Sequence, residues 1–493
     1  MKSKLKRTLY AGLLVITVCL SSCQKNPKQN PVVSKNDGAF DANLVQSAKE
    51  DKKPDATQSI RYSEEFSSTD GSVEFRMYID ADVFDGNWPV VEVKPHYLTE
   101  DDAQRVAIAL FGNVYFYESE PRLAPVYSKQ EMQENIKRWS QYTNQKSLRE
   151  LYGDYGGNLE YAETVIKNYI ENYTALCEEA DENYMHETCQ WKFKKESYYW
   201  EAAADLEGQP LENENDAIQA TFQNGNIKYE FSASTRDKDD FKINNICAYL
   251  SSGDSPYSID ERIYRAQLCR TKEPTESQLE EVKVKAESML DQMQLGSWLI
   301  DKCYVDTKYY DDVPEYTICI KAVPVLNGIP ALRRPQLANL KSDEAYASNY
   351  YLTDAEFEFS ANGDLVSFWM YSPIDVSNIV NDNVAVYGSD ALLEKAKNCL
   401  ELSDYYGYGF PGSLDSLDQD VGCTVNVMNM DMNLTRVKVP NSDESYYYIP
   451  ALTLVGNIEY YGKDNGTVYY CAENVTLLVM NAVDGSIINI TNE

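Results

Sequence analysis

The stretch that decides the fold class is residues 354–371, DAEFEFSANGDLVSFWMY, in which an Asn-Gly pair separates two segments of alternating polarity. Phe357 and Phe359 share one face of the first segment, and Phe368 and Met370 share one face of the second. Asn-Gly between two alternating segments is a strong short-range signal for a β-hairpin. The stretch therefore predicts two antiparallel strands with one buried face.

Three further dipeptides carry the same signal elsewhere in the chain: Asp70-Gly71, Asn224-Gly225 and Asp484-Gly485. We expect type I′ turns here, because both central residues of such a turn need positive φ, which Asn, Asp and Gly tolerate best. Hairpins dominate the pattern and a regular strand-helix-strand alternation does not. The sheets are therefore expected to be antiparallel.

Three helices with recognisable ends lie between the hairpin signals. Residues 99–111 and 275–295 start with capping boxes at Thr99 and Thr275, and a glycine follows each helix. Residues 389–402 show the same spacing of apolar side chains. Each of the last two helices is followed by strands, a Pro-Ala strand and a hairpin, which indicates two copies of one module.

The sequence thus predicts an α+β protein of repeated antiparallel sheet modules, each packed by a helix. We expect an N-terminal module at residues 61–270 and two further modules at residues 271–385 and 386–493. The N-terminal module is interpreted as a divergent copy with a helical insertion between Lys129 and Ala204, where apolar residues recur at helical spacing.

The N-terminus has the features of an export signal. Four basic residues among the first seven precede an apolar run, residues 9–20, that is too short to span a bilayer comfortably. The run ends in LSSC at residues 20–23, which resembles the bacterial lipobox. That resemblance implies a signal peptide at residues 1–22 and acylation of Cys23, with chains such as palmitate. The alternative is an ordinary signal peptide that happens to hold a cysteine.

Charge is distributed unevenly along the chain. The 493 residues include 45 Lys and Arg against 78 Asp and Glu, a net charge of −33. Residues 23–60 are polar and predict a flexible tether. Because residues 1–22 contribute +4 and residues 24–60 contribute +1, the body from Arg61 onward carries −38. This acidity opposes nucleic-acid binding, and it favours cations or basic peptides as partners.

Several phrases resemble uncharacterised lipoproteins of Gram-positive bacteria that carry a domain of unknown function. They are the opening after Cys23, with residues 31–33 and 35–38, and the segments 102–112 and 481–488. The last phrase also looks like the closing strands of PepSY-like extracellular modules, which are small helix-plus-hairpin units. The resemblance implies a fold class and an extracytoplasmic location, and it implies no catalytic residue.

Motifs of enzyme chemistry are scarce. Residues 407–412, GYGFPG, match the letters of a dinucleotide motif but follow a helix, so we interpret them as a Tyr- and Gly-rich loop. His96 and His186 lack the neighbours of a hydrolase signature and are interpreted as surface or capping residues. Beyond Cys19 and Cys23, nine cysteines remain, which either form at most four disulfides or stay as buried thiols.

Carboxylates are the remaining source of chemistry. Glu356 and Glu358 share one strand face, and a glycosidase needs two acids across a cleft, but a solvated polar face is the simpler interpretation. Residues 80–86 and 415–422 offer acidic ligands for calcium without the spacing of an EF-hand. We assign no catalytic residue and no metal ligand, and a loose Ca²⁺ site is the single cofactor hypothesis.

Tyrosine clusters are the last candidates for a site. Residues 198–200, 309–310 and 446–448 are rich in tyrosine, which is common in strands. A ligand-binding surface is the alternative interpretation of these clusters.

Together, these features predict a membrane-anchored, extracytoplasmic lipoprotein of the cell envelope. We expect a non-catalytic protein that binds or regulates another envelope protein or peptide, because the lipobox and tether are present and a catalytic signature is not recognised. Two other classes stay open: an envelope hydrolase that uses carboxylates, and a carbohydrate-binding or adhesion lipoprotein.

Substitution of Cys23 tests the anchor. Cys23→Ala removes the thiol that would carry the lipid, so the protein should be released to the medium or accumulate as unprocessed precursor. Membrane fractionation and the mass of the N-terminal peptide measure both outcomes. A processed variant that still sediments with membranes would exclude anchoring through Cys23.

Overall fold

The computed structural model describes most of the chain from residue 45 onward. Cys23 lies outside the described residues, as do residues 198–200, 407–412 and 415–420. Within the described residues, no helix has the length and apolar character needed to span a membrane. The described residues are 45–49, 56–119, 128–153, 158–182, 184–197, 212–238, 241–251, 258–310, 312–332, 353–402, 421–439, 442 and 445–488.

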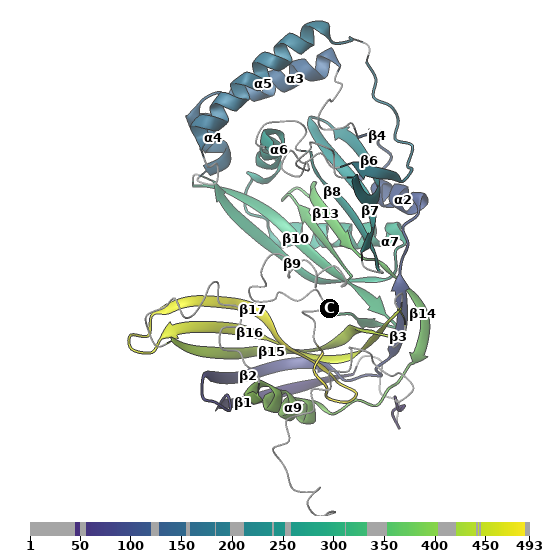
Figure 1. Ribbon diagram of the computed structural model, residues 1–493, viewed down its shortest axis with the longest axis vertical. Coiled ribbons are helices and arrows are strands. Elements are labelled where there is room, and N and C mark those ends of the chain that lie inside the picture. The colour runs from purple at the N-terminus through teal and green to yellow at the C-terminus, as the bar shows by residue number, and fades with distance from the viewer. Residues whose placement is uncertain are drawn as a thin grey trace, which may run out of the picture.

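Two sheets define an upper and a lower lobe (Figure 1). The upper sheet has ten described strands in the order β11-β10-β12-β13-β8-β7-β6-β4, with β9 beside β10 and β5 beside β6. Its strands are β4 (Tyr117–Glu118), β5 (Lys194–Ser197), β6 (Glu212–Asn224), β7 (Ile227–Lys238), β8 (Phe241–Leu250), β9 (Trp298–Tyr310), β10 (Val313–Leu326), β11 (Ile329–Pro330), β12 (Asp354–Phe359) and β13 (Leu365–Tyr371).

The lower sheet has seven described strands in the order β1-β2-β15-β16-β3-β14, with β17 beside β16. Its strands are β1 (Thr57–Ser67), β2 (Val73–Phe84), β3 (Val90–Pro95), β14 (Ile374–Asn381), β15 (Val421–Lys438), β16 (Tyr446–Gly462) and β17 (Val468–Asn481). The β2–β15 pair is parallel, whereas the neighbouring β1–β2 and β15–β16 pairs are antiparallel. The predicted α+β class, with antiparallel-rich sheets packed by helices, is confirmed.

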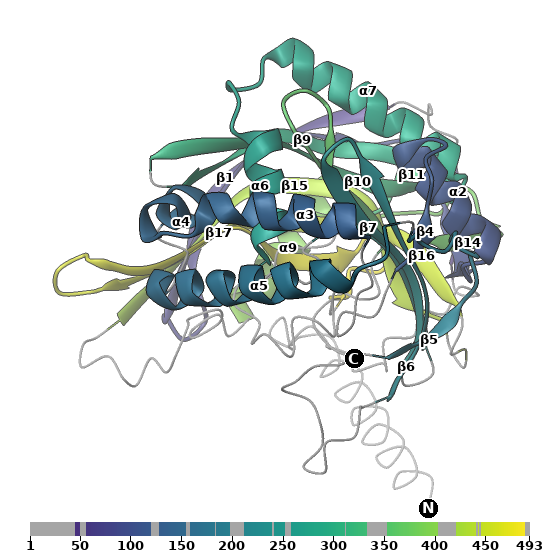
Figure 2. The same ribbon diagram turned by 90° about the horizontal axis from the view of Figure 1, so that it is seen from above.

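Two helices cover one face of the upper sheet, α2 (Glu100–Phe111) and α7 (Glu276–Met293). They lie side by side, and Arg105 Nε donates to the Met293 carbonyl oxygen at 2.8 Å. Alternate strand residues such as Phe357 and Phe368 are at most 1% exposed and share a core with these helices. In Figure 2 the sheet lies between α7 on one side and the helices of the insertion on the other.

The helix starts agree with the prediction. Capping boxes join Thr99 with Asp102 in α2 and Thr275 with Gln278 in α7. Helix α7 ends at Met293, before the predicted Leu295, because Gln294 already has the left-handed φ of 54° that terminates a helix.

The hairpin turns are present, but the expectation of type I′ geometry is wrong. The glycine of each predicted turn has positive φ, from 62° at Gly225 to 79° at Gly363, whereas the preceding Asn or Asp does not. In the β6–β7 hairpin, Asn224 pairs with Ile227, which leaves Gly225 at the first central position, as in a type II′ turn. The glycine alone therefore supplies the left-handed conformation.

The helical insertion comprises α3 (Lys129–Trp139), α4 (Gln145–Tyr152) and α5 (Leu159–Glu179), and α6 (Ile259–Cys269) packs against it. Asp260 at the start of α6 is buried and accepts hydrogen bonds from Arg138 Nε at 2.5 Å and from Trp139 Nε1 at 3.0 Å. These bonds fasten the insertion to α6. In the lower lobe, α9 (Ser389–Leu402) packs its apolar face on the sheet, and Lys397 pairs with Glu64 of β1.

The division into modules at residues 61–270, 271–385 and 386–493 does not match the sheets. Strands β1–β3 belong to the lower lobe, because β2 pairs with β15 and β3 pairs with β16. Strand β14 also leaves the second module to pair with β3. Long-range backbone hydrogen bonds therefore group the strands differently from their order in the chain.

The predicted tether at residues 23–60 is too long at its C-terminal end. Strand β1 already begins at Thr57, and Ser47 forms a bridge with Val384. Val45 packs against the apolar cluster around Trp88. A few apolar residues and backbone hydrogen bonds with residues 383–385 therefore dock this polar segment.

His96 lies at the junction where the chain passes from β3 in the lower lobe to α2 in the upper lobe. Its Nδ1 is 2.9 Å from Asp375 of β14, and its Nε2 is 3.1 Å from Asp102 of α2. Asn244 of β8 donates to the His96 carbonyl oxygen at 2.8 Å. Both ring nitrogens of His96 therefore face carboxylates from different elements. His96 thus connects β14, α2 and β8. We predicted a surface or capping residue, and the contact with the capping-box residue Asp102 agrees with the second interpretation.

Acid pH should weaken this junction through Asp102. Burial raises the pKa of Asp102, but hydrogen bonds from Thr99 and His96 outweigh it and hold the pKa below 3.8. A lowered native pKa contributes stability at neutral pH that is lost as the pH falls through the native value. Asp102→Asn should therefore lower the stability at neutral pH by about 1–2 kcal/mol, and the deficit should shrink in acid.

Thermal unfolding over a pH series measures this effect, with the exposed neighbour Asp101→Asn as the matched control. A deficit that stays constant between neutral and acid pH would contradict the assignment of the ionised Asp102.

Candidate functional site

The candidate site is the face of the upper sheet opposite α2 and α7. On the central strands β8 and β13, alternate residues point away from these helices: Tyr249 on β8, and Trp369 and Tyr371 on β13. The Tyr249 and Trp369 rings are 6.1 Å apart with an interplanar angle of 8°, and the Trp369 and Tyr371 rings are 6.2 Å apart at 10°. Trp369 is 37% exposed. We call these three residues the aromatic row.

Ion pairs flank the aromatic row on the same face. Glu356, the cross-strand neighbour of Trp369, accepts from Lys321 Nζ at 3.0 Å. Glu358 accepts from Arg265 of α6 at 3.0 Å and from the Ser367 hydroxyl at 3.2 Å. The two carboxylates that we considered for catalysis therefore lie on one strand face, as predicted, and each is paired with a cation.

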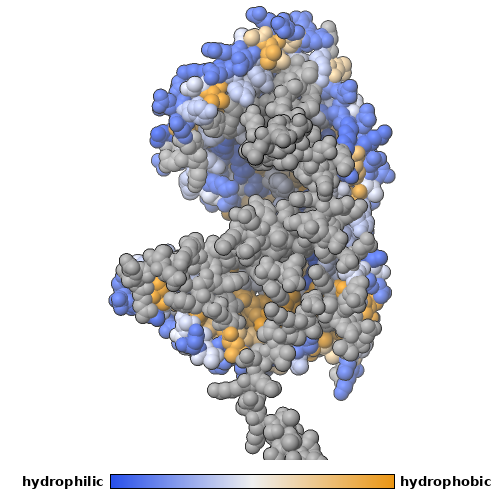
Figure 3. Space-filling model, viewed as in Figure 1, coloured by the Kyte–Doolittle hydropathy of each residue, from blue (hydrophilic) through white to orange (hydrophobic). Residues whose placement is uncertain are grey.

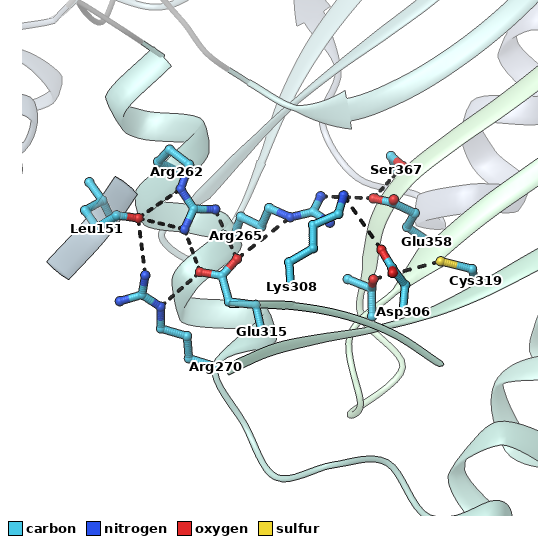
Figure 4. A network of polar contacts seen from close by, with 11 residues as sticks. Leu151, Arg262, Arg265, Arg270, Asp306, Lys308, Glu315, Cys319, Glu358 and Ser367 are labelled. Carbon is cyan, nitrogen blue, oxygen red and sulfur yellow. Dashed lines mark hydrogen bonds and ion pairs between the residues drawn. The ribbon is translucent and has the colours of Figure 1, made fainter. Parts of the chain in front are cut away.

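A larger network continues this face beneath α6 (Figure 4). Glu315 of β10 has a side chain that is only 2% exposed. Arg262 binds it through both terminal nitrogens, at 2.6 and 3.1 Å, and Arg270 Nε donates to it at 2.9 Å. Arg262 and Arg270 also donate to the carbonyl oxygen of Leu151, the penultimate residue of α4. The network therefore holds β10, α6 and α4 together.

One carboxyl group near this network has an unusual proton affinity. Burial raises the pKa of Glu261 on α6, and Glu230 and Glu358 raise it further, against the lowering effect of Arg265 and Arg262. A carboxyl group with a raised pKa is better suited than an ordinary one to act as a general acid near neutral pH. This is the arrangement on the described surface that comes nearest to acid-base chemistry.

Two cysteines beside this face are poor nucleophiles by their proton affinity, because burial disfavours their thiolates. Burial raises the pKa of Cys319 on β10 to about 11 and that of Cys269 on α6 to about 12. A raised pKa disfavours the reactive thiolate. The nine described cysteines are all free, so the interpretation as buried thiols holds for most of them and disulfides are not formed among them.

The structure separates the other residues that the sequence singled out. His186 Nε2 is 2.7 Å from Glu131 in the helical insertion. His96 instead contacts Asp102 and Asp375 at the junction of the lobes. Asp80 and Asp82 lie along β2 rather than in an acidic loop; Asp80 faces Arg61 at 3.5 Å, and Asp82 accepts from Ser59. Among the described residues, no group of three or more His, Cys, Asp or Glu side chains could hold a metal ion.

Sequence reasoning missed the aromatic row. It placed Tyr309-Tyr310 and residues 446–448 in strands, which is correct for β9 and β16, but it did not consider Trp369 and Tyr371. The signal was present in residues 367–371, because Trp369 and Tyr371 alternate with the buried Phe368 and Met370. Large aromatic residues at outward positions of a strand are a sign of a binding surface.

The site lies in the upper lobe. The molecular surface is hollowed where the two lobes meet. Figure 3 shows the outline recessed between the upper lobe and the arm formed by β15, β16 and β17, with mainly hydrophilic described residues on the upper side of the hollow. The lobes also share an apolar cluster that joins Trp88 and Tyr448 with Leu326 of β10.

Breaking the Glu315 network should have a large structural cost. Glu315→Gln leaves Arg262 and Arg270 without their buried counter-charge, so we expect a loss of about 3–5 kcal/mol in unfolding free energy. The matched control is Glu358→Gln, whose side chain is 28% exposed and should cost much less. Denaturant unfolding measures both variants, and equal losses would show that burial of Glu315 is not what makes the network important.

Comparisons with known proteins leave the family open. No protein-family model matches the chain, and no curated protein sequence matches it. Among solved structures, an uncharacterized protein from Eubacterium rectale is similar over 87% of this chain and 93% of that chain, with 10% sequence identity and a TM-score of 0.33. At this TM-score the likeness supports no inference about function.

Proposed function

We propose that this chain is a membrane-anchored, extracytoplasmic lipoprotein that binds another component of the cell envelope without catalysing a reaction. The ligand binds at the aromatic row of the upper lobe. The observation that carries the proposal is the partial exposure of Trp369 at the middle of a sheet, between strands that are paired on both sides. Large aromatic anchors on a polar surface are typical of binding sites.

The surroundings of Trp369 favour recognition because they are rigid. Strand β13 pairs with β8 on one side and β12 on the other, and its buried residues Phe368 and Met370 pack under α2 and α7. A ring held on such a strand loses little conformational freedom when a ligand binds. The anchor and tether would present this face outside the membrane.

A hydrolase that uses carboxylates is the second candidate. The specific observation in its favour is that Glu261, whose pKa is raised by burial, lies close enough to Glu358 for that carboxylate to raise its pKa further. We rank it below the binding protein because the ion pairs near Glu261, Arg262 with Glu315 and Arg265 with Glu358, already hold α6 on the sheet, and structural ion pairs also shift pKa values. Cleavage of a bound ligand would promote this candidate.

Site-directed photo-crosslinking in cells tests the proposed face. A photoreactive phenylalanine analogue in place of Trp369 should give an adduct with an envelope component, because the ligand would contact this ring. The full-length, anchored protein is used, and adducts are detected by their shift on a denaturing gel and by mass spectrometry.

The matched control carries the same analogue in place of Tyr78, which is 50% exposed on β2 of the lower lobe. Equal yields of the same adduct at both positions, or no adduct at position 369, would overturn the assignment of the binding face.

A further inference from the structure

We infer that the aromatic row binds an uncharged glycan. This inference rests on the proposed function and names the chemical class of its ligand. Two observations carry it: Glu356 and Glu358, which flank the row, are paired with cations of the protein itself although the whole chain is strongly acidic, and the partly exposed Trp369 lies between two nearly parallel tyrosine rings.

The carboxylates that flank the aromatic row already have partners within the protein. Lys321 neutralises Glu356, and Arg265 neutralises Glu358. Arg262 and Arg270 both bind Glu315, and Glu230, the cross-strand neighbour of Tyr249, accepts a hydrogen bond from the Ser251 hydroxyl at 2.5 Å. A charged ligand would have to compete with these pairs, which already have hydrogen-bond geometry. An uncharged ligand needs no such exchange, so the site favours one.

The net charge of −33 also bears on which charged polymers could be ligands. The field of the body repels anionic polymers such as polyuronates or polyphosphates. It attracts basic peptides, but the carboxylates beside Trp369 already have cationic partners. The local pairs and the overall field therefore disfavour both kinds of charged ligand at the aromatic row.

The rings themselves suit a sugar chain. Successive ring centroids are 6.1 and 6.2 Å apart, and interplanar angles of 8° and 10° keep the three rings nearly parallel. The C–H face of a sugar ring packs on an aromatic face, while its hydroxyl groups reach polar neighbours. Such neighbours are present: Glu356 and Lys321 lie beside Trp369, and Ser367 lies on the same face of β13. A wholly apolar ligand would instead desolvate these charges without replacing their hydrogen bonds.

A binding survey with defined probes tests the ligand class. The full-length protein in detergent is measured against neutral oligosaccharides of glucose, mannose, galactose, xylose and N-acetylglucosamine. Polygalacturonate and oligolysine are the charged comparisons. The variants are Trp369→Ala, the conservative Trp369→Phe, and Tyr78→Ala as an exposed aromatic control on the lower lobe. Thermal unfolding of each variant verifies that it is folded.

We expect at least one neutral oligosaccharide to bind, with little change between low and high salt, since screening acts on charges. Trp369→Ala should weaken this binding by about tenfold or more, as loss of an aromatic anchor does. Trp369→Phe should retain most of the affinity, and Tyr78→Ala should equal the parent protein. Shortening of the bound oligosaccharide would still support the ligand class, although it would favour the hydrolase over the binding protein.

Three results would overturn the inference. They are binding of no neutral oligosaccharide, equal affinity in the parent and in folded Trp369→Ala, and salt-sensitive binding of a charged probe that depends on Trp369. The crosslinking experiment distinguishes this failure from failure of the proposed function. A protein adduct at position 369 would keep the binding face and exclude the glycan.

Discussion

Strands β8 and β13 are far apart in the chain but pair antiparallel, with Trp369 opposite Cys247 and Tyr371 opposite Asn245. This pairing joins β6–β8 and β9–β13 into one sheet, and it brings α2 and α7 together on one face. Alternation along the two strands sends Ala248 and Phe368 under the helices and Tyr249 and Trp369 to the other side. Both the core of the upper lobe and its aromatic row depend on this register.

A one-residue slip of β13 against β8 would reverse both sets of side chains. The fully buried Phe368 would then face water, and Trp369 would enter a core already filled by α2 and α7. The burial of the apolar residues therefore fixes the position of the aromatic row. In this way the stability of the lobe and the geometry of the proposed site have the same physical cause.

Buried charge has a positioning role in the rest of the upper lobe. Glu315 with Arg262 and Arg270 connects β10 to α6, and Asp260 with Arg138 connects α6 to α3. A buried ion pair often adds little net stability, but a partner without its counter-charge is costly, so the helices have one favourable position on the sheet. At the junction of the lobes, His96 between Asp102 and Asp375 acts similarly on β3, α2 and β14.

The sequence by itself determined the local elements of this protein. The capping boxes at Thr99 and Thr275 and the glycine turns at Gly225 and Gly363 depend on neighbouring residues, and they appear where their patterns predict them. The polar face of Glu356 and Glu358 was likewise predictable from alternation. Only the tertiary structure decided which strands share a sheet. Nearly every residue offers the same backbone donor and acceptor, so the hydrogen bonds between distant strands leave no recognisable motif in the sequence. It therefore decided that Tyr249 lies beside Trp369, that three arginines surround Glu315, and that His96 contacts Asp375.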